Sequence, residues 1–456
     1  MPLSPLALST DLYEITMMAG YFVAGRTAPA TFELYVRDLP RPRSYLVAAG
    51  LDQALAYLEG LRFTAEEIEY LRRLPMLEPV PPAFFDEYLP SFRFTGEVWA
   101  VEEGTPVFGH EPLLRVTAPI AEAQLVETAL LASVGFQTSI ASKASRVVEA
   151  AAGRTVVEFG SRRAHGTEAA CLAARAAYLA GCDDTSNVEA GFRFGIPVSG
   201  TMAHSWVMSF DRELDAFQSF FDLYGRRSTL LIDTYDTLRA AREVVAAGLK
   251  PGSVRLDSGD LATLAGEVRT ILDEGGLQEI RIFATGDLDE HKIAELLSRG
   301  APIDGFGVGT SLSTSKDAPA LGAIYKMADL EHDGELVETM KLSEGKVSYP
   351  GRKQVWRVVD SSGEPGAPEA RRDVLALEGE PGPEGARPLL CRVMADGRRL
   401  ADPVPLATLR DACRRAVAEL PASVRAIDSP GEYEVAVSEK LRRLTELLTS
   451  SRRGAV

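Results

Sequence analysis

The stretch VRLDSGD at residues 254–260 joins a short apolar run to an abrupt polar ending. A run of this length predicts a buried strand, and the apolar residues behind it recur at the spacing of a helix. Five more apolar runs between Thr155 and Ser313 end in acidic, glycine, basic or histidine residues. They lie at residues 155–159, 196–199, 230–232, 280–284 and 306–308. The repeated alternation of strand and helix predicts an α/β fold built on parallel strands.

The polar endings predict where a functional site lies. Parallel strands need long crossover connections, so helices cover the sheet and bury the strands on both faces. Loops that leave the carboxyl ends of such strands meet at one mouth, which carries the active site. A single aspartate or glycine after a strand is usually a turn residue or a helix cap. Six polar endings at corresponding places favour a site.

Composition narrows the classes of function. At 456 residues the chain is long enough for two or three domains. A formal charge of -16 and a pI near 5.0 argue against nucleic acid or an anionic membrane as the main partner. The four cysteines and five histidines show no metal-site spacing, which predicts a reduced, cytoplasmic setting. Neither a signal peptide nor a transmembrane stretch is indicated, so we expect a soluble protein.

Three segments are expected along the chain. Residues 1–125 predict an N-terminal α+β lobe, residues 126–328 an α/β barrel with the active site, and residues 329–456 a C-terminal segment that packs on the N-terminal lobe. Local patterns predict a helix after Asp11, a strand at 31–36, an antiparallel unit at 96–118, helices at 121–134 and 139–152, a surface loop at 361–388, a strand at 389–394, a helix at 406–419 and an amphipathic end at 432–448.

The ending after the first run has the chemistry to bind a flat anion. Arg162 and Arg163 follow the strand at 155–159. Guanidinium groups bind carboxylates in a bidentate manner, and the neighbouring aromatic Phe159 favours a flat anionic ring. A salt bridge is the structural alternative for either arginine.

Carboxylates follow three successive runs. Asp233, Asp257 and Asp287 could converge on the hydroxyl groups of a substrate or on Mg²⁺, which commonly takes one or two carboxylates plus substrate oxygens. Arg255, within one of these strands, could balance their charge. Each aspartate alone could equally cap the helix that follows.

Two further endings suggest phosphate chemistry. The glycine-rich string at 305–311 belongs to the sixth unit, where barrels often bind phosphate through backbone N–H groups and a following helix. His165 and His204 follow the first and second runs, and either could act as an acid, a base or a phosphate acceptor. A lone histidine is more often a hydrogen-bonded structural residue.

With these motifs placed, the chain resembles the nicotinate phosphoribosyltransferase family over most of its length. The resemblance is carried by STDLY at 9–13, FELYVR at 32–37, FGSRRA at 159–164, TSN at 185–187, GTMAHS at 200–205, LDSGD at 256–260 and FGVGT at 306–310. It implies an irregular TIM-like α/β barrel of a type II phosphoribosyltransferase, with a second α+β lobe built from the N- and C-terminal segments. It also implies that nicotinate and phosphoribosyl pyrophosphate become nicotinate mononucleotide and pyrophosphate, coupled to ATP hydrolysis, in NAD salvage.

The resemblance also implies roles for residues. His204 and Asp257 are the catalytic candidates, and ATP would transiently phosphorylate His204. Phe159 and Tyr13 would sandwich the pyridine ring, with Tyr13 supplied by a neighbouring subunit, so that a homodimer shares its active sites. Arg162 would hold the ring carboxylate. The other implied contacts to substrates are Arg37, Thr185, Ser186, Asn187, Asp233, Arg255, Gly286, Asp287, Gly307, Gly309, Thr310 and the basic segment 341–353, with Asp257 and Asp287 as ligands of Mg²⁺.

One departure from the family pattern leaves an alternative substrate. Asp184 stands beside the ring segment, where a small residue is expected, and its charge would repel a carboxylate. Either Asp184 points away into a helix cap, which we favour, or the enzyme prefers nicotinamide. A quinolinate enzyme would need more cations than Arg162, Arg163 and His165. An aldolase would need a lysine at a strand end, where none stands, and a non-catalytic binding scaffold is the remaining class.

Overall fold

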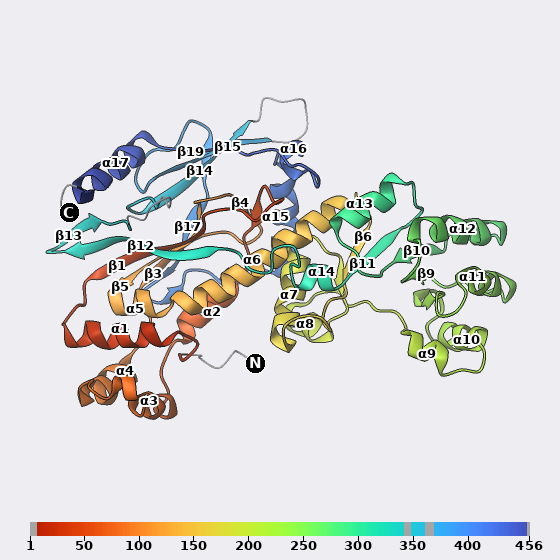
Figure 1. Ribbon diagram of the computed structural model, residues 1–456, viewed down its shortest axis with the longest axis horizontal. Helices are drawn as coiled ribbons and strands as arrows, with labels where there is room; N and C mark the ends of the chain where they lie inside the picture. The colour runs from red at the N-terminus through yellow and green to blue at the C-terminus, as the bar shows by residue number, and fades with distance from the viewer. Residues whose placement is uncertain (1–6, 342–347, 361–368, 454–456) are drawn as a thin grey trace.

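Five of the six apolar runs form strands of one parallel sheet (Figure 1). These strands are β6 (Thr155–Glu158), β8 (Thr229–Leu231), β9 (Ser253–Leu256), β10 (Arg281–Ala284) and β11 (Gly305–Val308). The computed structural model describes residues 7–341, 348–360 and 369–453. Within them the sheet has the order β7-β6-β11-β10-β9-β8, and its neighbouring strands pair in parallel. The predicted α/β class is confirmed.

The sixth place in the sheet belongs to a segment that the apolar pattern does not indicate. The run at 196–199 makes only an isolated parallel bridge between Val198 and Thr185, whereas β7 (Asp184–Thr185) pairs with β6. Proline has no N–H to donate to a ladder, and Pro197 instead accepts a hydrogen bond from Thr185 through its carbonyl oxygen. The predicted strand at 196–199 is therefore wrong.

The parallel strands form a half-barrel. Their ladder runs from β7 to β8, and these two strands are not paired with each other in the part of the chain that is described. Helices follow the strands in turn, namely α7 (Thr167–Leu179), α11 (Thr237–Ala246), α12 (Leu261–Glu274) and α13 (Glu290–Ser298). The carboxyl ends of the strands therefore share one edge, as the site prediction requires. The TIM-like character of the barrel stays a prediction.

A seven-stranded sheet combines the two ends of the chain. Its order is β13-β12-β1-β5-β3-β17-β18. β1 (Pro29–Val36) pairs antiparallel with β12 (Ala323–His332), and β3 (Glu97–Val101) pairs antiparallel with β17 (Leu390–Ala395). The other short strands are β2 (Leu46–Val47), β4 (Pro106–Val107), β5 (Pro112–Pro119), β13 (Glu335–Glu338) and β18 (Arg398–Arg399). The domain boundaries at residues 125 and 328 stay predictions.

A four-stranded sheet corrects the predicted surface loop at 361–388. It consists of β14 (Lys353–Asp360), β15 (Glu369–Leu377), β16 (Ala386–Pro388) and β19 (Val435–Val437). Residues 361–368 lie outside the described residues. The charged residues of this segment suggest a surface loop, but Asp373 of β15 is fully buried. It forms an ion pair with Arg357 of β14, at 2.6 Å between Oδ2 and Nη2. Buried charges that find partners can stand in a strand.

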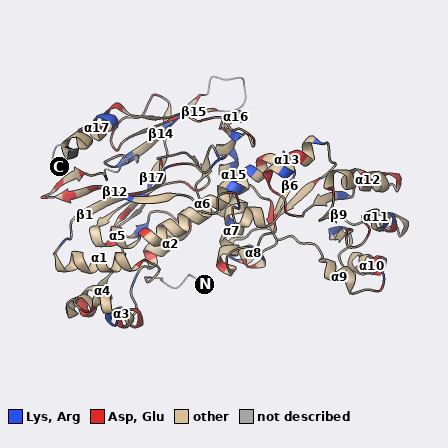
Figure 2. Cartoon of the chain, in the orientation of Figure 1, with Lys and Arg blue, Asp and Glu red and all other residues tan. Residues whose placement is uncertain are grey.

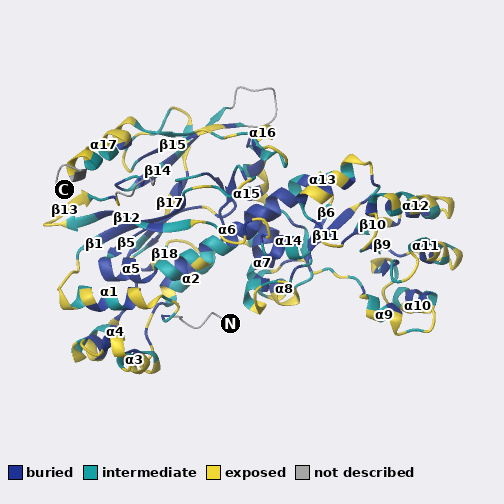
Figure 3. Cartoon of the chain, viewed as in Figure 1, coloured by how far each residue is buried: buried dark blue, intermediate teal, exposed yellow. Residues whose placement is uncertain are grey.

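Helix α6 (Glu127–Ala150) lies between the two large sheets (Figure 1). The sequence predicts two helices, at 121–134 and 139–152, but the structure has a short α5 (Ile120–Leu125) followed by one continuous α6. Gly135 lies inside α6 without breaking it. Tertiary burial stabilises the helix across this weak point, and Figure 3 shows that much of α6 is buried.

The remaining helices surround these sheets. α1 (Leu12–Val23) follows Asp11 as predicted, and α15 (Leu406–Ala418) confirms the predicted C-terminal helix. The amphipathic end at 432–448 divides into β19 and α17 (Glu439–Arg453). The others are α2 (Leu51–Gly60), α3 (Ala65–Arg72), η1 (Pro75–Leu77), η2 (Phe84–Tyr88), α4 (Leu89–Ser91), α8 (Val188–Phe194), α9 (His204–Met208), α10 (Glu213–Tyr224), η3 (Gly225–Arg227), α14 (Thr310–Ser313) and α16 (Ala422–Arg425). None of the helices in the described ranges could cross a membrane.

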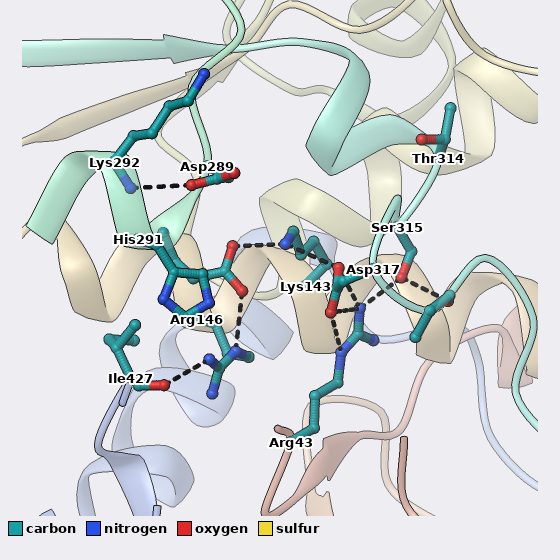
Figure 4. A network of polar contacts seen from close by, with 12 residues as sticks. Arg43, Lys143, Arg146, Asp289, His291, Lys292, Thr314, Ser315, Asp317 and Ile427 are labelled. Atoms are coloured by element: carbon teal, nitrogen blue, oxygen red, sulfur yellow. Dashed lines mark hydrogen bonds and ion pairs between the residues drawn. The ribbon is translucent and has the colours of Figure 1, made fainter. Parts of the chain in front are cut away.

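A buried network of charges joins α6 to the segments beyond β10 and β11 (Figure 4). Lys143 Nζ lies 2.5 Å from Glu290 Oε2 and 2.8 Å from Asp317 Oδ1. Arg146 Nε donates to Glu290 at 3.1 Å, and Arg43 Nη2 pairs with Asp317 at 3.0 Å. Charges of both signs are interspersed over the rest of the chain (Figure 2). Here three buried cations meet the buried Glu290 and the more exposed Asp317.

Candidate active site

Arg255 joins the loops at the carboxyl edge of the half-barrel. Its Nη2 donates to Asp257 Oδ1 at 2.7 Å, its Nε donates to the hydroxyl of Thr285 at 2.8 Å, and its Nη1 donates to the hydroxyl of Thr201 at 2.7 Å. The hydroxyl of Thr285 also donates to Asp257. A guanidinium has five donors in a fixed plane, so one side chain fixes the endings of β9 and β10 and the segment before α9.

Asp257 is held in its ionised form. Burial alone would raise the pKa of Asp257, but the hydrogen bond from Thr285 and the charge and hydrogen bond of Arg255 outweigh burial. The pKa therefore lies below its ordinary value. The site contains a permanent carboxylate at neutral pH.

His204 faces this carboxylate from the start of α9. Its Nε2 lies 3.8 Å from Asp257 Oδ2, and its Nδ1 lies 3.2 Å from the hydroxyl of Thr234. The His204 side chain is 42% exposed. The imidazole is oriented on two sides and still open to solvent, which a group that reacts with a small molecule requires. The structure thus places His204 with the predicted site.

Asp233 supports the same edge from β8. Its Oδ2 accepts the backbone N–H of Asp257 at 2.9 Å and the hydroxyl of Ser258 at 2.7 Å. Its Oδ1 is buried and has no hydrogen-bond partner among the described residues. A buried acceptor without a partner is costly, so this oxygen is suited to receive a hydroxyl group or a cation from a ligand.

Gly286 and Asp287 form a tight turn after β10. Gly286 has a φ of +99°, and a Cβ there would collide with the carbonyl oxygen of Asp257. Asp287 has a φ of +49°, a left-handed conformation that non-glycine residues seldom adopt. Its side chain is exposed, while its carbonyl oxygen accepts from Lys292 Nζ at 2.8 Å. The turn approaches the backbone of Asp257 through Gly286 and leaves Asp287 exposed to solvent.

Glycines of β11 and its loop make room for the ring segment. A Cβ on Gly307 would lie 2.5 Å from the Phe159 ring, and a Cβ on Gly309 would lie 3.3 Å from the Phe159 carbonyl oxygen. The Phe159 ring centroid lies 5.9 Å from Cζ of Arg255. Thr310 opens α14 directly after these glycines. The structure therefore brings Phe159 together with Gly307, Gly309 and Arg255, and Thr310 follows Gly309 in the chain.

The polar segment 185–187 is largely occupied by contacts inside the protein. Thr185 is fully buried, and its hydroxyl donates to Glu158 Oε2 at 2.6 Å. Asn187 Nδ2 donates to Ser161 Oγ at 3.1 Å, and Asn187 Oδ1 caps α8. Ser186 is half-exposed, and its hydroxyl has no hydrogen-bond partner within the described ranges. Of the three predicted contacts, Ser186 is the hydroxyl left for a ligand.

Two charged residues flank this segment. Arg162 is exposed in the turn after β6, and no ion-pair partner for it exists among the residues described. Asp184 is not a helix cap as we expected, since it lies in β7 and Asn187 caps α8. Side chains alternate along a strand, so Asp184 points to the face opposite Thr185. Burial raises the pKa of Asp184, while a hydrogen bond with Ser199 lowers it.

Tyr13 and Arg37 lie outside this cluster. Tyr13 is on α1, which Figure 1 places well away from the carboxyl edge of the half-barrel, and its side chain is 45% exposed. Arg37 follows β1 in the seven-stranded sheet, and its Nε is buried without a hydrogen-bond partner in the described part of the chain. A single chain does not bring these two predicted contacts to the site.

The predicted basic segment 341–353 is partly accounted for. Residues 342–347 lie outside the described residues, and Lys353 is buried in an ion pair with Glu33, at 2.6 Å between Nζ and Oε2. Lys341 instead lines a cleft of 220 Å³ together with Lys326. Lys353 is therefore not available to a ligand, and Lys326 is a cation that the sequence pattern does not single out.

Metal binding by protein groups alone is not indicated. Among the described residues no three of the His, Cys, Asp and Glu side chains converge as a metal site does. Both oxygens of Asp257 already face other groups, whereas Asp287 is exposed and Asp233 Oδ1 has no partner. A Mg²⁺ ion would fit here only with substrate oxygens completing its coordination.

Sequence reasoning missed the hydroxyl groups of the site. Thr201, Thr234 and Thr285 contact Arg255, His204 and Asp257. A signal was present, because each threonine stands in one of the polar endings, next to the glycine or aspartate that we singled out.

Comparison with known protein families agrees with these placements. Three family models match the chain: the nicotinate phosphoribosyltransferase N-terminal domain at residues 8–135, the nicotinate phosphoribosyltransferase family at 155–360, and the nicotinate phosphoribosyltransferase C-terminal domain at 382–445. A nicotinate phosphoribosyltransferase of Mycobacterium tuberculosis is 46% identical over 446 residues, which cover 95% of this chain and 92% of the relative. That of Bacillus subtilis is 44% identical over 368 residues, covering 78% and 74%.

Solved structures give the same result for the fold. The crystal structure of human nicotinic acid phosphoribosyltransferase matches with a TM-score of 0.82 at 27% identity, covering 96% of this chain and 99% of the human one. A nicotinate-nucleotide pyrophosphorylase from Pyrococcus furiosus matches with a TM-score of 0.72 at 24% identity, covering 91% and 96%. The second match shows a shared fold alone.

Proposed function

This chain belongs to the nicotinate phosphoribosyltransferase family, and from that membership and its site we propose that it converts nicotinate and phosphoribosyl pyrophosphate into nicotinate mononucleotide and pyrophosphate, in NAD salvage. The observation that carries the proposal is the cluster in which Arg255 holds Asp257 and two threonine hydroxyls beside the aromatic face of Phe159. Such a site suits a flat ring next to a polyhydroxylated sugar.

The ring would bind at the end of β6. Phe159 would cover one face of the pyridine, and Arg162, which is exposed and free of an ion pair among the described residues, would hold the carboxylate as a bidentate partner. Ser186 would add a neutral hydroxyl donor. These contacts would hold the ring nitrogen in line with the sugar.

The sugar phosphate would bind across β8 to β11. The ring nitrogen would attack the anomeric carbon as its bond to pyrophosphate breaks, through an oxocarbenium-like state. Asp233 Oδ1, which has no partner among the described residues, would accept a ribose hydroxyl. The backbone at Gly307 to Thr310 would receive the phosphate. Positioning and electrostatics would supply most of the rate enhancement.

Mg²⁺ would serve this reaction by neutralising the departing pyrophosphate. The exposed Asp287 is the better protein ligand in this arrangement, and Asp233 Oδ1 is a second candidate. Asp257 is less suited, because Arg255, Thr285 and His204 already surround its carboxylate.

Coupling to ATP is part of the proposal. The support is that His204 is exposed and oriented by Asp257 and Thr234, as a phosphate acceptor must be. We expect γ-labelled ATP to give an acid-labile adduct on His204. If His204→Ala takes up the same label and keeps its ATP-dependent rate, the assignment fails.

A homodimer with shared sites is also proposed. The support is apolar exposure on two helices: Tyr13 and Met17 of α1 are 45% and 37% exposed, and Val188 and Phe192 of α8 are 72% and 87% exposed. Apolar residues gathered on a surface favour a covered interface. If Tyr13 completes the partner's site, mixing Tyr13→Ala with His204→Ala chains should restore about a quarter of the wild-type sites. No recovery in re-equilibrated mixtures would contradict sharing.

The choice of substrate has its own test. The exposed Arg162 favours nicotinate. Nicotinamide is the alternative if the carboxylate of Asp184, two residues before Ser186, faces the ring. Product formation should be measured with each pyridine, phosphoribosyl pyrophosphate and Mg²⁺, with and without ATP. A higher kcat/KM for nicotinamide would overturn the proposal. We also propose a TIM-like barrel with a second α+β lobe, which the likeness to the human structure supports, and a cytoplasmic location.

A further inference from the structure

The carboxylate of Glu158 lies beneath both segments that would receive nicotinate. Glu158 ends β6 and is 1% exposed. Its Oε1 accepts the backbone N–H of Gly160, and its Oε2 accepts the hydroxyl of Thr185 at 2.6 Å. Its backbone oxygen accepts the N–H of Ser186 at 3.0 Å. One residue therefore contacts the turn that carries Arg162 and the segment that carries Ser186.

These hydrogen bonds close into a ring. The Thr185 hydroxyl oxygen accepts the backbone N–H of Asn187 at 3.0 Å, and Asn187 Nδ2 donates to Ser161 Oγ at 3.1 Å. Ser161 follows Gly160, so the circuit returns to Glu158. The single proton of the Thr185 hydroxyl is committed to Glu158. Thr185 therefore has no donor left for a substrate.

The turn after β6 is fixed from its other side as well. The carbonyl oxygen of Gly160 accepts the hydroxyl of Ser313 at 3.2 Å and the backbone N–H of Arg163 at 2.8 Å. A Cβ on Gly160 would collide with Ser313 and lie 2.8 Å from Glu158 Oε1. The turn has little freedom while Glu158 is in place, and it loses a buried acceptor when Glu158 is removed.

We propose that Glu158 is a positioning residue that sets the separation of Arg162 and Ser186, and thereby the affinity for nicotinate, without touching the substrate. This inference rests on the proposed function. Burial raises the pKa of Glu158, and the hydrogen bonds from Thr185 and Gly160 lower it. A buried carboxylate is costly unless hydrogen bonds offset its desolvation, and here those hydrogen bonds join segments 27 residues apart in the sequence.

The test is a kinetic comparison with a matched control. Glu158→Ala should raise KM for nicotinate about tenfold or more, because two buried donors lose their acceptor, and should leave KM for phosphoribosyl pyrophosphate within about twofold. Glu158→Gln can accept from Gly160 and donate to Thr185, so it should restore most of the affinity. The control is Glu122→Ala, since Glu122 is buried and likewise accepts the N–H and hydroxyl of one threonine, Thr95, at 2.6 and 3.0 Å.

A second variant keeps the proposal testable if Glu158→Ala fails to fold. Thr185→Val measured alone should also raise KM for nicotinate. Where Glu158→Ala does fold, adding Thr185→Val to it should raise KM no further, because both changes break the same circuit. The proposal is overturned if KM for nicotinate stays unchanged, if both substrates weaken in parallel, if Glu122→Ala has the same effect, or if the two changes add. A wild-type protein that does not use nicotinate would overturn the proposed function instead.

Discussion

The carboxylate of Asp257 faces the imidazole of His204 across 3.8 Å, between Oδ2 and Nε2. The other carboxylate oxygen receives Arg255 at 2.7 Å. Asp257 therefore connects a guanidinium that is always charged to an imidazole that is charged only when protonated. An ionised carboxylate in this place orients the imidazole.

Replacing that charge should affect catalysis more than folding. Asp257→Asn keeps the shape of the side chain but removes the negative charge between Arg255 and His204. A hydrogen bond to a charged group contributes about 1.5 to 3 kcal/mol, so we expect kcat to fall roughly 10- to 100-fold. Steady-state kinetics measure the loss, and circular dichroism checks the fold.

The matched control is in the same loop. Asp260 is exposed, caps α12 and pairs with Arg299 at 3.0 Å. Asp260→Asn should change stability little, because asparagine also caps helices and an exposed ion pair contributes little, and it should leave kcat near the wild-type value. Equal losses of kcat in both variants would show that the loop responds to any lost charge.

The turn at Gly286 should tolerate no side chain. Gly286 has a φ of +99°, and a Cβ would collide with the carbonyl oxygen of Asp257. Gly286→Ala should therefore combine backbone strain with displacement of Asp257 and raise KM for phosphoribosyl pyrophosphate. Gly276 is the control, because it has a φ of +73° with nothing within 4 Å of a Cβ. Gly276→Ala should cost about 1 kcal/mol in unfolding free energy without changing KM. A normal KM in Gly286→Ala would contradict the close approach.

The sequence indicates the framework of the site because that framework is local. Apolar runs with polar endings place Asp233, Asp257 and Asp287 at one edge, since parallel strands present their carboxyl ends together. The hydrogen bonds that the sequence does not reveal join residues far apart in the chain. Thr185 lies 27 residues from Glu158, and Thr285 lies 30 residues from Arg255, so no periodicity within one segment reveals their hydrogen bonds.

The fold departs from local expectation where tertiary contacts override composition. α6 continues through Gly135 because it packs against α7 and β12, and β15 holds a buried Asp373 because Arg357 neutralises it. The run at 196–199 fails as a strand because Pro197 cannot donate to a ladder. The first two departures depend on contacts with residues distant in the sequence, and the third depends on the N–H that proline lacks.

The buried charge network should respond unequally to the loss of its members. Lys143→Met leaves Arg146 with Glu290 and Arg43 with Asp317, so the charges balance. We expect a change in unfolding free energy of about 1 kcal/mol or less, because no charge is left without a partner. Glu290→Gln leaves Lys143 and Arg146 without that carboxylate and should cost about 3 to 5 kcal/mol. Urea unfolding measures both. A Lys143→Met variant as unstable as Glu290→Gln would contradict the argument.

Glu14 should make stability depend on pH. It is fully buried on α1 and accepts the N–H and the hydroxyl of Thr128 at 3.0 and 2.9 Å. Burial raises the pKa of Glu14 from 4.5 to about 7, against the hydrogen bonds from Thr128, which lower it. The folded protein therefore binds this proton more tightly than the unfolded chain does. The stabilisation is complete below the unfolded pKa and is lost as the pH rises through the folded one.

The size of the effect follows from the shift. Between about pH 5 and pH 8 the wild type should lose roughly 2 to 3 kcal/mol of unfolding free energy relative to Glu14→Gln, whose amide does not titrate. Urea unfolding of both proteins at the two pH values isolates the contribution of Glu14 to the unfolding free energy, because every other titrating group is common to both. A difference that stays constant, or that favours the wild type more at higher pH, would show that Glu14 remains ionised in the folded protein.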